Sequence, residues 1–342
     1  MVLCVKVRKK DAEKTRKHLV EIGVFDKRYK TFFDSAYVYF PIKDKVKGYE
    51  TVEKKLKAAE QSYFSLEEAL KDRLSEDELS KLTKSFDIIG DIAVIEIGKG
   101  LERYEKDIAE AIMKVHKHVK TVCKRAGKHG GVFRIRPVEV IGGDKRTLTE
   151  HKESGARMLV DVNKVYFTPR LSHERERIAS QVKAGERIAY FFAGVGPFAL
   201  VIGKKQKNVK IYAIELNPEA YRLLVKNISL NHMENIIIPI KGDVSVAYKR
   251  IAERCDRIIM PLPEGARHFL KYAFKIAKAD AVVHYYQFAP KDNAFEYAEE
   301  IVKEEADKEG IAFKIINKRI ARPYSPSTVQ VVLDIKLLKA DA

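Results

Sequence analysis

From Arg187 onward, short apolar runs alternate with stretches of helical periodicity, and this alternation constrains the fold more than any other feature of the 342-residue sequence. The apolar runs are RIAYFFAG, VKIYAIEL, NIIIPIKGD, CDRIIMPLP, DAVVHYYQF, KIINKRIA and VQVVLDIKLL. Strands that alternate with helices predict a parallel α/β sheet. Only a short loop around Arg322-Pro323-Tyr324 separates the last two runs, so we expect an antiparallel hairpin at that edge of the sheet.

The sequence before this region predicts two further domains. VLCVKV, a helical stretch and AYVYFPI form a small α/β unit in the first 45 residues, and the Lys/Glu/Leu-rich stretch 49–85, which includes TVEKKLKAAEQ and SEDELSKLTKS, predicts bridging helices. FDIIGDIAVIEI predicts a hairpin over residues 86–97, and a helix follows from Leu101 to about Val119. We therefore expect a small N-terminal α/β domain over residues 1–60, a middle α+β domain over 61–165 and a larger α/β domain over 166–342.

Composition narrows the class of protein. The formal charge is +17, from 65 Lys and Arg against 48 Asp and Glu, which predicts a polyanionic partner, nucleic acid first. A Lys/Glu-rich thermophile surface is the alternative. No apolar run approaches the length of about 18 to 20 residues that a membrane helix needs, and the charged start is unlike a signal peptide, so we expect a cytoplasmic protein. The three scattered cysteines and nine histidines lack metal-ligand spacing, so no metal site is expected.

The first turn of the α/β region predicts a nucleoside site. After an apolar strand come Phe192, Gly194 and Gly196, and such glycines let the backbone approach a ligand. Glu215 ends the next strand and can accept from both ribose hydroxyls, while Asp243 ends the third strand and can accept from an adenine amino group. Their neighbours Leu216 and Val244 are further candidate contacts. A glycine turn chosen for packing, with a surface acid, is the alternative.

A proline-rich turn follows the fourth strand. Its residues Pro261, Leu262 and Pro263 can present carbonyl groups and a rigid wall beside a flat base. With the hairpin at the end of the chain, this order of motifs resembles the class I, Rossmann-like, S-adenosylmethionine-dependent methyltransferase fold and not a dehydrogenase.

Several separate motifs carry a closer resemblance over nearly the whole chain. They are Phe133-Arg134-Ile135-Arg136, RTLTEHKESG over 146–155, VYFTPRLSHERERI over 165–178, FFAGVGPF, Asp243 and HYYQF from His284. With them the chain resembles the archaeal and eukaryal tRNA (guanine-37-N1)-methyltransferases of the unknotted class. The resemblance implies S-adenosyl-L-methionine as cofactor, and tRNA as partner, contacted at its anticodon loop and, by the N-terminal domain, at its outer corner.

The resemblance also assigns roles to residues. Guanine N1 carries a proton, so its methylation needs a base, and charge that builds on O6 needs a donor. Family positions make Glu174 the base and Arg134 the O6 donor, and Arg175 would bind the methionine carboxylate of the cofactor. The alternative for Glu174 is a solvated helix start capped by Ser172, and for Arg175 an exposed helix arginine.

A basic run over residues 114–138 holds eight Lys or Arg and three His without an acid, and it predicts contacts with the RNA backbone. A solvated basic helix face is the alternative. The expected substrate and tRNA contacts in and beyond this run are Lys117, Lys120, Lys124, Arg125, Arg136, His151, Tyr166, Arg170, Pro261, Leu262 and Pro263. For His151, a structural role is the alternative.

Two positions depart from the family pattern. Tyr190 stands where the family usually has an acid, and Pro261 stands where it usually has Asn. An archaeal branch with Pro at that position also methylates C7 of 4-demethylwyosine, so we expect a bifunctional tRNA methyltransferase. The alternatives are an enzyme specific for guanine N1, a transferase of the aminocarboxypropyl group, and a noncatalytic RNA-binding protein with a degenerate cofactor fold. One chain supplies all the required parts, so we expect a monomer without an obligate protein partner.

Overall fold

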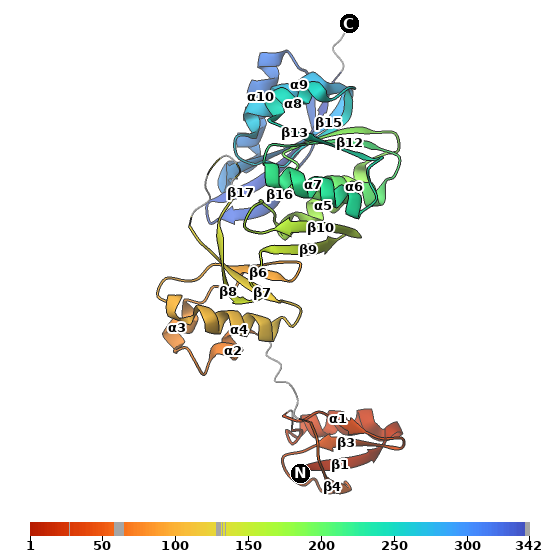
Figure 1. The fold of residues 1–342 in the computed structure, drawn as a ribbon, viewed down its shortest axis with the longest axis vertical. Coiled ribbons are helices and arrows are strands. Elements are labelled where there is room, and N and C mark those ends of the chain that lie inside the picture. The colour runs from red at the N-terminus through yellow and green to blue at the C-terminus, as the bar shows by residue number, and fades with distance from the viewer. Residues whose placement is uncertain (27, 58–64, 128–130, 132, 134, 339–342) are drawn as a thin grey trace. The chain divides into compact units, whose positions relative to one another are not determined.

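The computed structural model describes residues 1–26, 28–57, 65–127, 131, 133 and 135–338. The chain divides into two compact units, residues 1–69 and residues 70–342 (Figure 1). The predicted boundary near residue 60 lies outside the described residues.

In the described residues up to 57, the first unit contains a small sheet packed against a helix, and its strands pair antiparallel, which the predicted α/β unit did not specify. The strand order is β2-β3-β1-β4, and Leu19 of the helix packs with Val5 and Phe40 of the sheet. The elements are β1 (Val2–Arg8), α1 (Ala12–Glu21), β2 (Phe32–Phe33), β3 (Tyr37–Pro41) and β4 (Thr51–Lys54). The helix expected from Thr51 onward is wrong for these first four residues, because the edge of β1 pairs with them from Val2 to Val5 and satisfies their backbone groups.

A four-stranded sheet of order β5-β6-β7-β8 begins the second unit. The predicted hairpin is confirmed as β5 (Asp87–Ile89) and β6 (Ile92–Ile95), and the predicted helix is α4 (Glu105–Val115), which connects β6 to the parallel β7. The other elements are α3 (Glu76–Ser80), β7 (Thr121–Arg125) and β8 (Val138–Gly143), while α2 (Leu66–Leu70) spans the boundary between the two units.

A two-stranded ribbon follows, formed by β9 (Leu148–Glu153) and β10 (Ala156–Asp161). Its buried face, with Ala156, Met158 and Val160, belongs to the same hydrophobic core as the helices of the C-terminal region. The predicted division at residues 165 and 166 therefore separates segments that share one core, and it stays a prediction.

The large sheet has seven strands in the order β13-β12-β11-β14-β15-β17-β16. Each apolar run of the sequence is one of its strands: β11 (Arg187–Phe191), β12 (Lys210–Glu215), β13 (Ile237–Lys241), β14 (Cys255–Met260), β15 (Ala277–Pro290), β16 (Phe313–Ser325) and β17 (Thr328–Leu337). β17 runs antiparallel to both of its neighbours, β15 and β16, which confirms the predicted terminal hairpin. The order reverses between β11 and β14, so their carboxyl ends open a crevice at the point where α/β proteins bind ligands.

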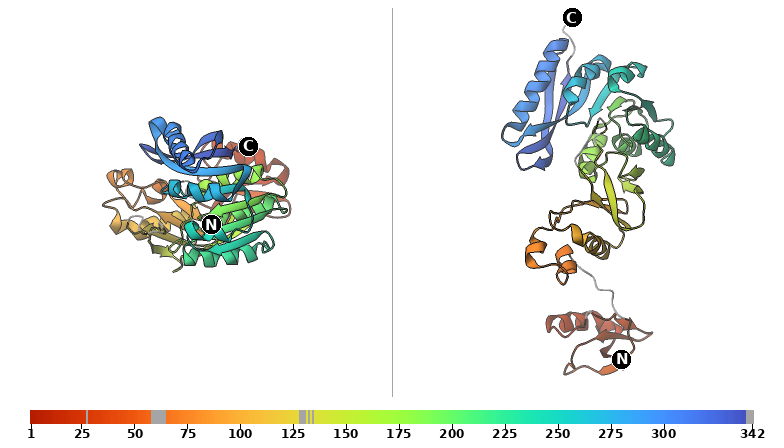
Figure 2. Two further views of the ribbon diagram at one scale, coloured as in Figure 1. Left: turned by 90° about the horizontal axis from the view of Figure 1, so that it is seen from above. Right: turned by 60° about the vertical axis from the view of Figure 1, so that its left-hand side comes forward.

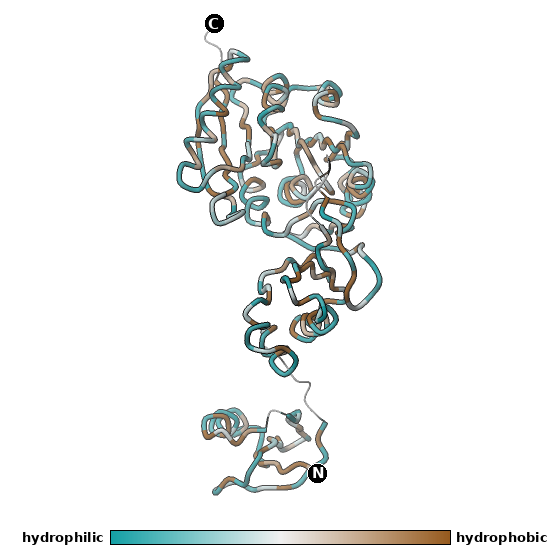
Figure 3. Tube along the Cα trace, turned by 90° about the vertical axis from the view of Figure 1, so that its left-hand side faces the viewer, coloured by the Kyte–Doolittle hydropathy of each residue, from teal (hydrophilic) through white to brown (hydrophobic). Residues whose placement is uncertain are grey.

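Helices cover both faces of this sheet (Figures 1 and 2). Side chains alternate along β11, so that Ile188 and Tyr190 enter one core and Ala189 and Phe191 enter the other. The first core is closed by α5 (Ser172–Gln181), α6 (Pro197–Lys205) and α7 (Pro218–Leu230), the second by α8 (Val244–Ala247), α9 (Leu270–Ile276) and α10 (Ala294–Glu309). Figure 3 shows the pattern along the chain: hydrophobic residues are dense in the central strands and alternate with hydrophilic ones along the outer helices.

Candidate cofactor and substrate site

One cavity of about 680 Å³ lies at the carboxyl ends of the central strands in the second unit. Most residues that the sequence singles out as cofactor or substrate contacts line it: Arg125, Arg136, Tyr166, Arg170, Arg175, Phe192, Gly194, Glu215, Leu216, Asp243, Val244, Pro261, Leu262 and Pro263. Segments far apart in the sequence thus meet at one site.

Glu215 forms the nucleoside side of the cavity. It ends β12, and its carboxylate accepts from the backbone N–H of Gly194 at 2.6 Å and of Asn217 at 2.7 Å. Burial raises the pKa of Glu215, while these two backbone hydrogen bonds act in the opposite direction. The bonds fix the carboxylate against the glycine turn, and the remaining lone pairs of its oxygens can accept from hydroxyl groups.

The two glycines of the turn have different reasons to be glycine. Gly194 lines the cavity and has a left-handed φ of 57°. Gly196 does not line it, and a Cβ there would come within 2.6 Å of a methyl group of Leu224. Close packing on α7 and a φ of 92° are by themselves reasons for this glycine, and its predicted contact with the cofactor stays a prediction.

The second acid and the proline turn complete this side of the cavity. Asp243 caps α8, where its Oδ1 accepts from the N–H of Ser245 at 2.7 Å. The carbonyl oxygen of Pro263 accepts from the N–H of Phe288 at 3.0 Å, so this carbonyl is already used within the protein. The ring of Phe192 stacks edge-on against Phe269, with centroids 4.9 Å apart, and both rings line the cavity.

Tyr190, which replaces the acid of the family pattern, is 2% exposed. Its ring meets that of Phe198 edge-on at 5.6 Å, and burial raises the pKa of its hydroxyl. Tyr190 thus puts a buried aromatic ring at the position where the family pattern has an acid.

Arg175 is buried on the cavity wall, 2% exposed, and is not the exposed helix arginine of the alternative interpretation. Its Nε and Nη2 donate to the two carboxylate oxygens of Glu153, each at 2.6 Å. Its role toward the cofactor carboxylate stays a prediction.

Four further arginines line another part of the wall, and we call Arg125, Arg136, Arg170 and Arg322 the arginine wall. Three of these arginines form ion pairs with two acids: Asp87 of β5 pairs with both Arg125 and Arg170, and Glu96 pairs with Arg136. The fourth, Arg322, donates to Gln330 and to the hydroxyl of Tyr166. Cations exceed anions there, whereas Glu215 and Asp243 make the nucleoside side acidic.

The rest of the basic run lies elsewhere. The run includes the end of α4 and the strand β7, so a single basic helix face is the wrong interpretation. Lys117, Lys120 and Lys124 do not line the cavity, and the amine of Lys124 is paired with Glu105 at 2.8 Å and with Glu139 at 3.0 Å. Arg134, the predicted O6 donor, lies outside the described residues.

Glu174, the predicted base, is buried beside the cavity but does not line it. Its Oε2 accepts from Arg177 at 3.0 Å and from the hydroxyl of Tyr286 at 3.1 Å. Arg319 lies 3.1 Å from Oε1, yet no donor among the described residues meets hydrogen-bond geometry at that oxygen. The residue is therefore no solvated helix start, and its role as base stays a prediction.

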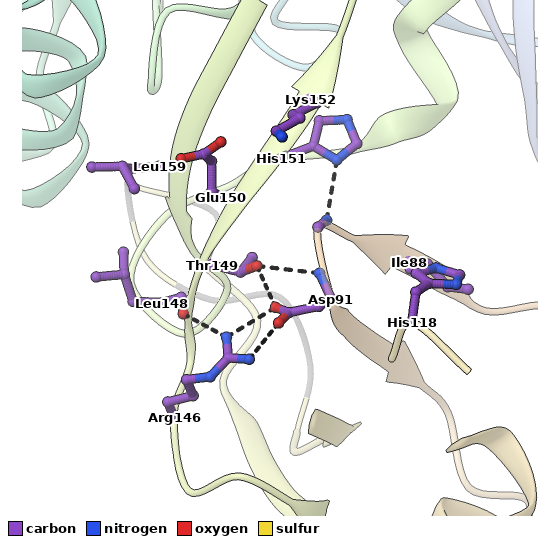
Figure 4. Close-up of a pocket in the computed structure, with 11 residues that line it drawn as sticks. Ile88, Asp91, His118, Arg146, Leu148, Thr149, Glu150, His151, Lys152 and Leu159 are labelled. Atoms are coloured by element: carbon purple, nitrogen blue, oxygen red, sulfur yellow. Dashed lines mark hydrogen bonds and ion pairs between the residues drawn. The ribbon is translucent and has the colours of Figure 1, made fainter. Parts of the chain in front are cut away.

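His151 lies where β9 contacts the β5–β6 hairpin, and it lines an open groove of about 810 Å³ (Figure 4). Its Nδ1 accepts from the N–H of Gly90 at 3.2 Å, and Nε2 lies 3.6 Å from Glu153. Both ring nitrogens thus face partners inside the protein, which favours the structural alternative, and the predicted contact with RNA stays a prediction. Between the same two elements, Asp91 accepts from Arg146 and Thr149, so these three side chains satisfy one another.

Several residues of the site were not predicted. Asp87 and Glu96 were missed because a lone acid in a strand carries no sequence signal. Tyr324 and Phe288 line the cavity with stacked rings, 4.2 Å between centroids, and Tyr324 is 53% exposed. The HYYQF motif, which ends at Phe288, was the available signal for this pair.

The described residues offer neither a metal centre nor a membrane-spanning helix. No three His, Cys, Asp or Glu side chains gather there that could hold a metal ion. No helix in the same ranges is long and apolar enough to cross a membrane.

The strand order, the glycine turn and the paired acids Glu215 and Asp243 define a class I S-adenosylmethionine-dependent methyltransferase. Three family models match the chain: the TRM5/TYW2 methyltransferase domain over residues 149–315, the TYW2 N-terminal domain over 66–147 and the tRNA methyltransferase 5 N-terminal domain over 4–50. The chain belongs to the TRM5/TYW2 family, and within it to the archaeal Trm5 type.

Individual relatives agree with this assignment. The chain is 38% identical to the tRNA (guanine(37)-N(1))-methyltransferase Trm5b of Pyrococcus abyssi, over 98% of this chain and 99% of that protein, and a crystal structure of that enzyme superposes with a TM-score of 0.75 at 99% and 100% coverage. A complex of aTrm5 with tRNALeu, 36% identical, covers 98% of this chain and 99% of that one with a TM-score of 0.81. The bifunctional Taw22 of Nanoarchaeum equitans, named tRNA (guanine(37)-N(1))/4-demethylwyosine(37)-methyltransferase, is 31% identical over 64% of this chain and 88% of its own length.

Proposed function

We propose that this enzyme methylates position 37 of tRNA, at N1 of guanosine and at C7 of 4-demethylwyosine, with S-adenosyl-L-methionine as methyl donor. The observation that carries the proposal is the division of one cavity into an acidic nucleoside side and an arginine wall. A cationic nucleoside cofactor suits the first part, and the phosphates of an RNA loop suit the second.

The described residues fit the cofactor. Glu215 would accept from the ribose hydroxyls, Asp243 would accept from the adenine amino group, and Arg175 would hold the methionine carboxylate. The cofactor supplies a methyl group on a positively charged sulfur, so the leaving group is already good. The protein then has to align the target atom with that methyl group.

The target base must leave its stack in the anticodon loop to enter the cavity, and single-stranded loops permit this. The exposed rings of Tyr166 and Tyr324 can receive a flat base, and the arginine wall can neutralise the flanking phosphates. Glu174 would remove the N1 proton of guanine. For the tricyclic substrate the nucleophile is a carbon, and Glu174 would remove its proton after transfer.

Pro261 favours the second activity. It replaces the side-chain amide of the usual Asn by a rigid ring that lines the cavity. The likeness to Taw22, which is named for both activities, supports the same conclusion. We further propose that the protein is a cytoplasmic monomer, since one chain supplies both parts of the site.

The test is nucleoside mass spectrometry on two tRNA substrates, one with guanosine-37 and one with 4-demethylwyosine-37, each incubated with protein and S-adenosylmethionine. We expect a mass gain of one methyl group in both nucleosides. Methylation of guanosine alone would show an enzyme specific for N1 and make Pro261 a neutral variation. A gain equal to an aminocarboxypropyl group would show the other transfer, and no product from either tRNA would favour a noncatalytic RNA-binding protein.

A further inference from the structure

Glu153, the last residue of β9, holds Arg175 by two hydrogen bonds of 2.6 Å in a bidentate pair. Both side chains are withdrawn from water: that of Glu153 is 8% exposed and that of Arg175 is 2% exposed. A bidentate carboxylate fixes both the position and the plane of a guanidinium group. Glu153 thus determines how Arg175 faces the cavity.

Other contacts leave one edge of the guanidinium for a ligand. Nη2 also donates to the carbonyl oxygen of Thr168 at 3.2 Å, and the group lies over the ring of Phe167 at 5.4 Å. Among the described residues, none accepts a hydrogen bond from Nη1. An arginine on a cavity wall with two N–H groups left is suited to bind a carboxylate.

A second residue of β9, His151, lies next to Glu153. His151 and Glu153 are two positions apart on one strand, so their side chains lie on the same face. The His151 ring packs on Phe167 at 5.1 Å, and its Nε2 lies 3.6 Å from Glu153. Its other nitrogen is held by the N–H of Gly90, in the turn of the β5–β6 hairpin. A continuous series of contacts therefore links that turn to the wall of the cofactor cavity.

We propose that Glu153 is a positioning residue of the methyltransferase: it holds Arg175 so that Nη1 meets the carboxylate of the cofactor, and His151 supports it. The proposal rests on the proposed cofactor use. Without the carboxylate of Glu153, Arg175 would keep a buried charge without its partner and would turn away from the ligand.

The test compares two ligands that differ in the methionine part. Calorimetry would measure the binding of S-adenosylhomocysteine, which has the carboxylate, and of adenosine, which lacks it, to the full-length protein and to Glu153→Gln. We expect the variant to bind S-adenosylhomocysteine about 10- to 100-fold more weakly, as for the loss of a charged hydrogen bond, and adenosine as before. Glu150→Gln is the matched control, because Glu150 lies on the same strand and also pairs with an arginine, Arg157, but does not line the cavity.

The outcomes separate the two proposals. If Glu153→Gln weakens both ligands equally, or neither, Glu153 does not position Arg175 and the inference is overturned while the proposed function stands. If the unmodified protein binds neither ligand, the cofactor use fails and the inference fails with it. Glu153→Asp, which keeps the charge on a shorter side chain, is the second variant, should the first not fold. A moderate loss of affinity for S-adenosylhomocysteine alone supports the proposal. Equal losses of affinity for both ligands contradict it.

Discussion

Glu174 lies at the end of a buried series of charged groups. Arg177 links it to Asp334 at 2.6 Å, and Asp334 accepts from Nδ1 of His284 at 2.6 Å. Because Arg257 can only donate to Nε2 of His284, the imidazole is neutral with its proton on Nδ1. Arg177 and Arg319 lie against the Glu174 carboxylate, and no donor among the described residues meets hydrogen-bond geometry at its buried Oε1. A carboxylate oxygen without a hydrogen-bonded donor keeps its lone pairs for a proton, as the proposed role of Glu174 requires.

Replacing Glu174 tests this residue directly. We expect Glu174→Gln to lower kcat on guanosine-37 tRNA by about 100-fold or more, because an amide cannot take the N1 proton. The KM for tRNA should change little, since the substitution keeps the shape of the side chain. Glu176→Gln is the control: it lies on the same helix and is paired with Lys205. Undiminished turnover on either tRNA substrate would remove Glu174 from the mechanism for that substrate.

The pair of Glu153 and Arg175 also makes stability depend on pH. Burial alone would raise the pKa of Glu153, but hydrogen bonds from Arg175 and His151 hold it at about 2, below the usual 4.5. A carboxyl group whose pKa is lowered by folding stabilises the fold above its unfolded pKa, and this contribution is lost as the pH falls toward the folded pKa. Urea unfolding at several pH values should show Glu153→Gln less stable than the unmodified protein by about 3 kcal/mol at pH 7. The difference should shrink as the pH falls from 4.5 toward 2, and a difference independent of pH would contradict the assignment.

At the scale of elements, one side chain of α7, that of Asn227, bonds both to the β9–β10 ribbon and to the glycine turn. Asn227 is 0% exposed; its Oδ1 accepts from the N–H of Leu159 at 2.7 Å, and its Nδ2 donates to the carbonyl oxygens of Leu159 at 3.1 Å and Val195 at 3.0 Å. Three backbone groups from β10 and from the turn before α6 thus depend on one amide. The amide of Asn227 therefore stabilises the turn that carries Gly194.

Truncation of this amide should destabilise the protein. Asn227→Ala leaves buried backbone groups without partners, so we expect the free energy of unfolding to fall by about 3 kcal/mol. The exposed Asn208 offers the control, and Asn208→Ala should stay within about 0.5 kcal/mol. Thermal and urea unfolding would measure both variants. Equal stability of the two would show that water replaces the lost hydrogen bonds.

Elements differ in how well the sequence predicts them. The strands from β11 to β17 were predicted because buried parallel strands read as continuous apolar runs with helices between them. The prediction of a helix fails at Thr51–Lys54, because the Lys/Glu/Leu-rich stretch that follows favours a helix, whereas Thr51 and Val52 are β-branched and pair with β1. Glu215 and Asp243 could be predicted because strand ends place them at one edge of the sheet. The partners of His151 and Arg175 could not, because they depend on how separate elements meet in space.

At the scale of the whole molecule, positive charge is spread over both units. The first 60 residues carry 16 Lys and Arg against 9 acids, while the second unit has the arginine wall. Many of the cations in the site already have acidic partners, as Arg125 and Arg170 share Asp87. A phosphate of the RNA would therefore replace an existing carboxylate partner or bind beside it. How much one Lys or Arg adds to RNA affinity then depends on whether a carboxylate already pairs with it.

Salt dependence measures this effect. We expect tRNA affinity to fall about 100-fold between 50 and 200 mM NaCl, which corresponds to about four neutralised phosphates, while the affinity for S-adenosylhomocysteine stays constant. Two lysines of the basic run form a matched pair: Lys120 is exposed, whereas Lys124 is bound by Glu105 and Glu139. If Lys120 meets the RNA backbone, Lys120→Gln should lower the slope of log affinity against log salt by about one. Lys124→Gln should change it less, because two carboxylates already match that charge. A slope near zero for the unmodified protein would exclude phosphate contacts as the main source of tRNA affinity.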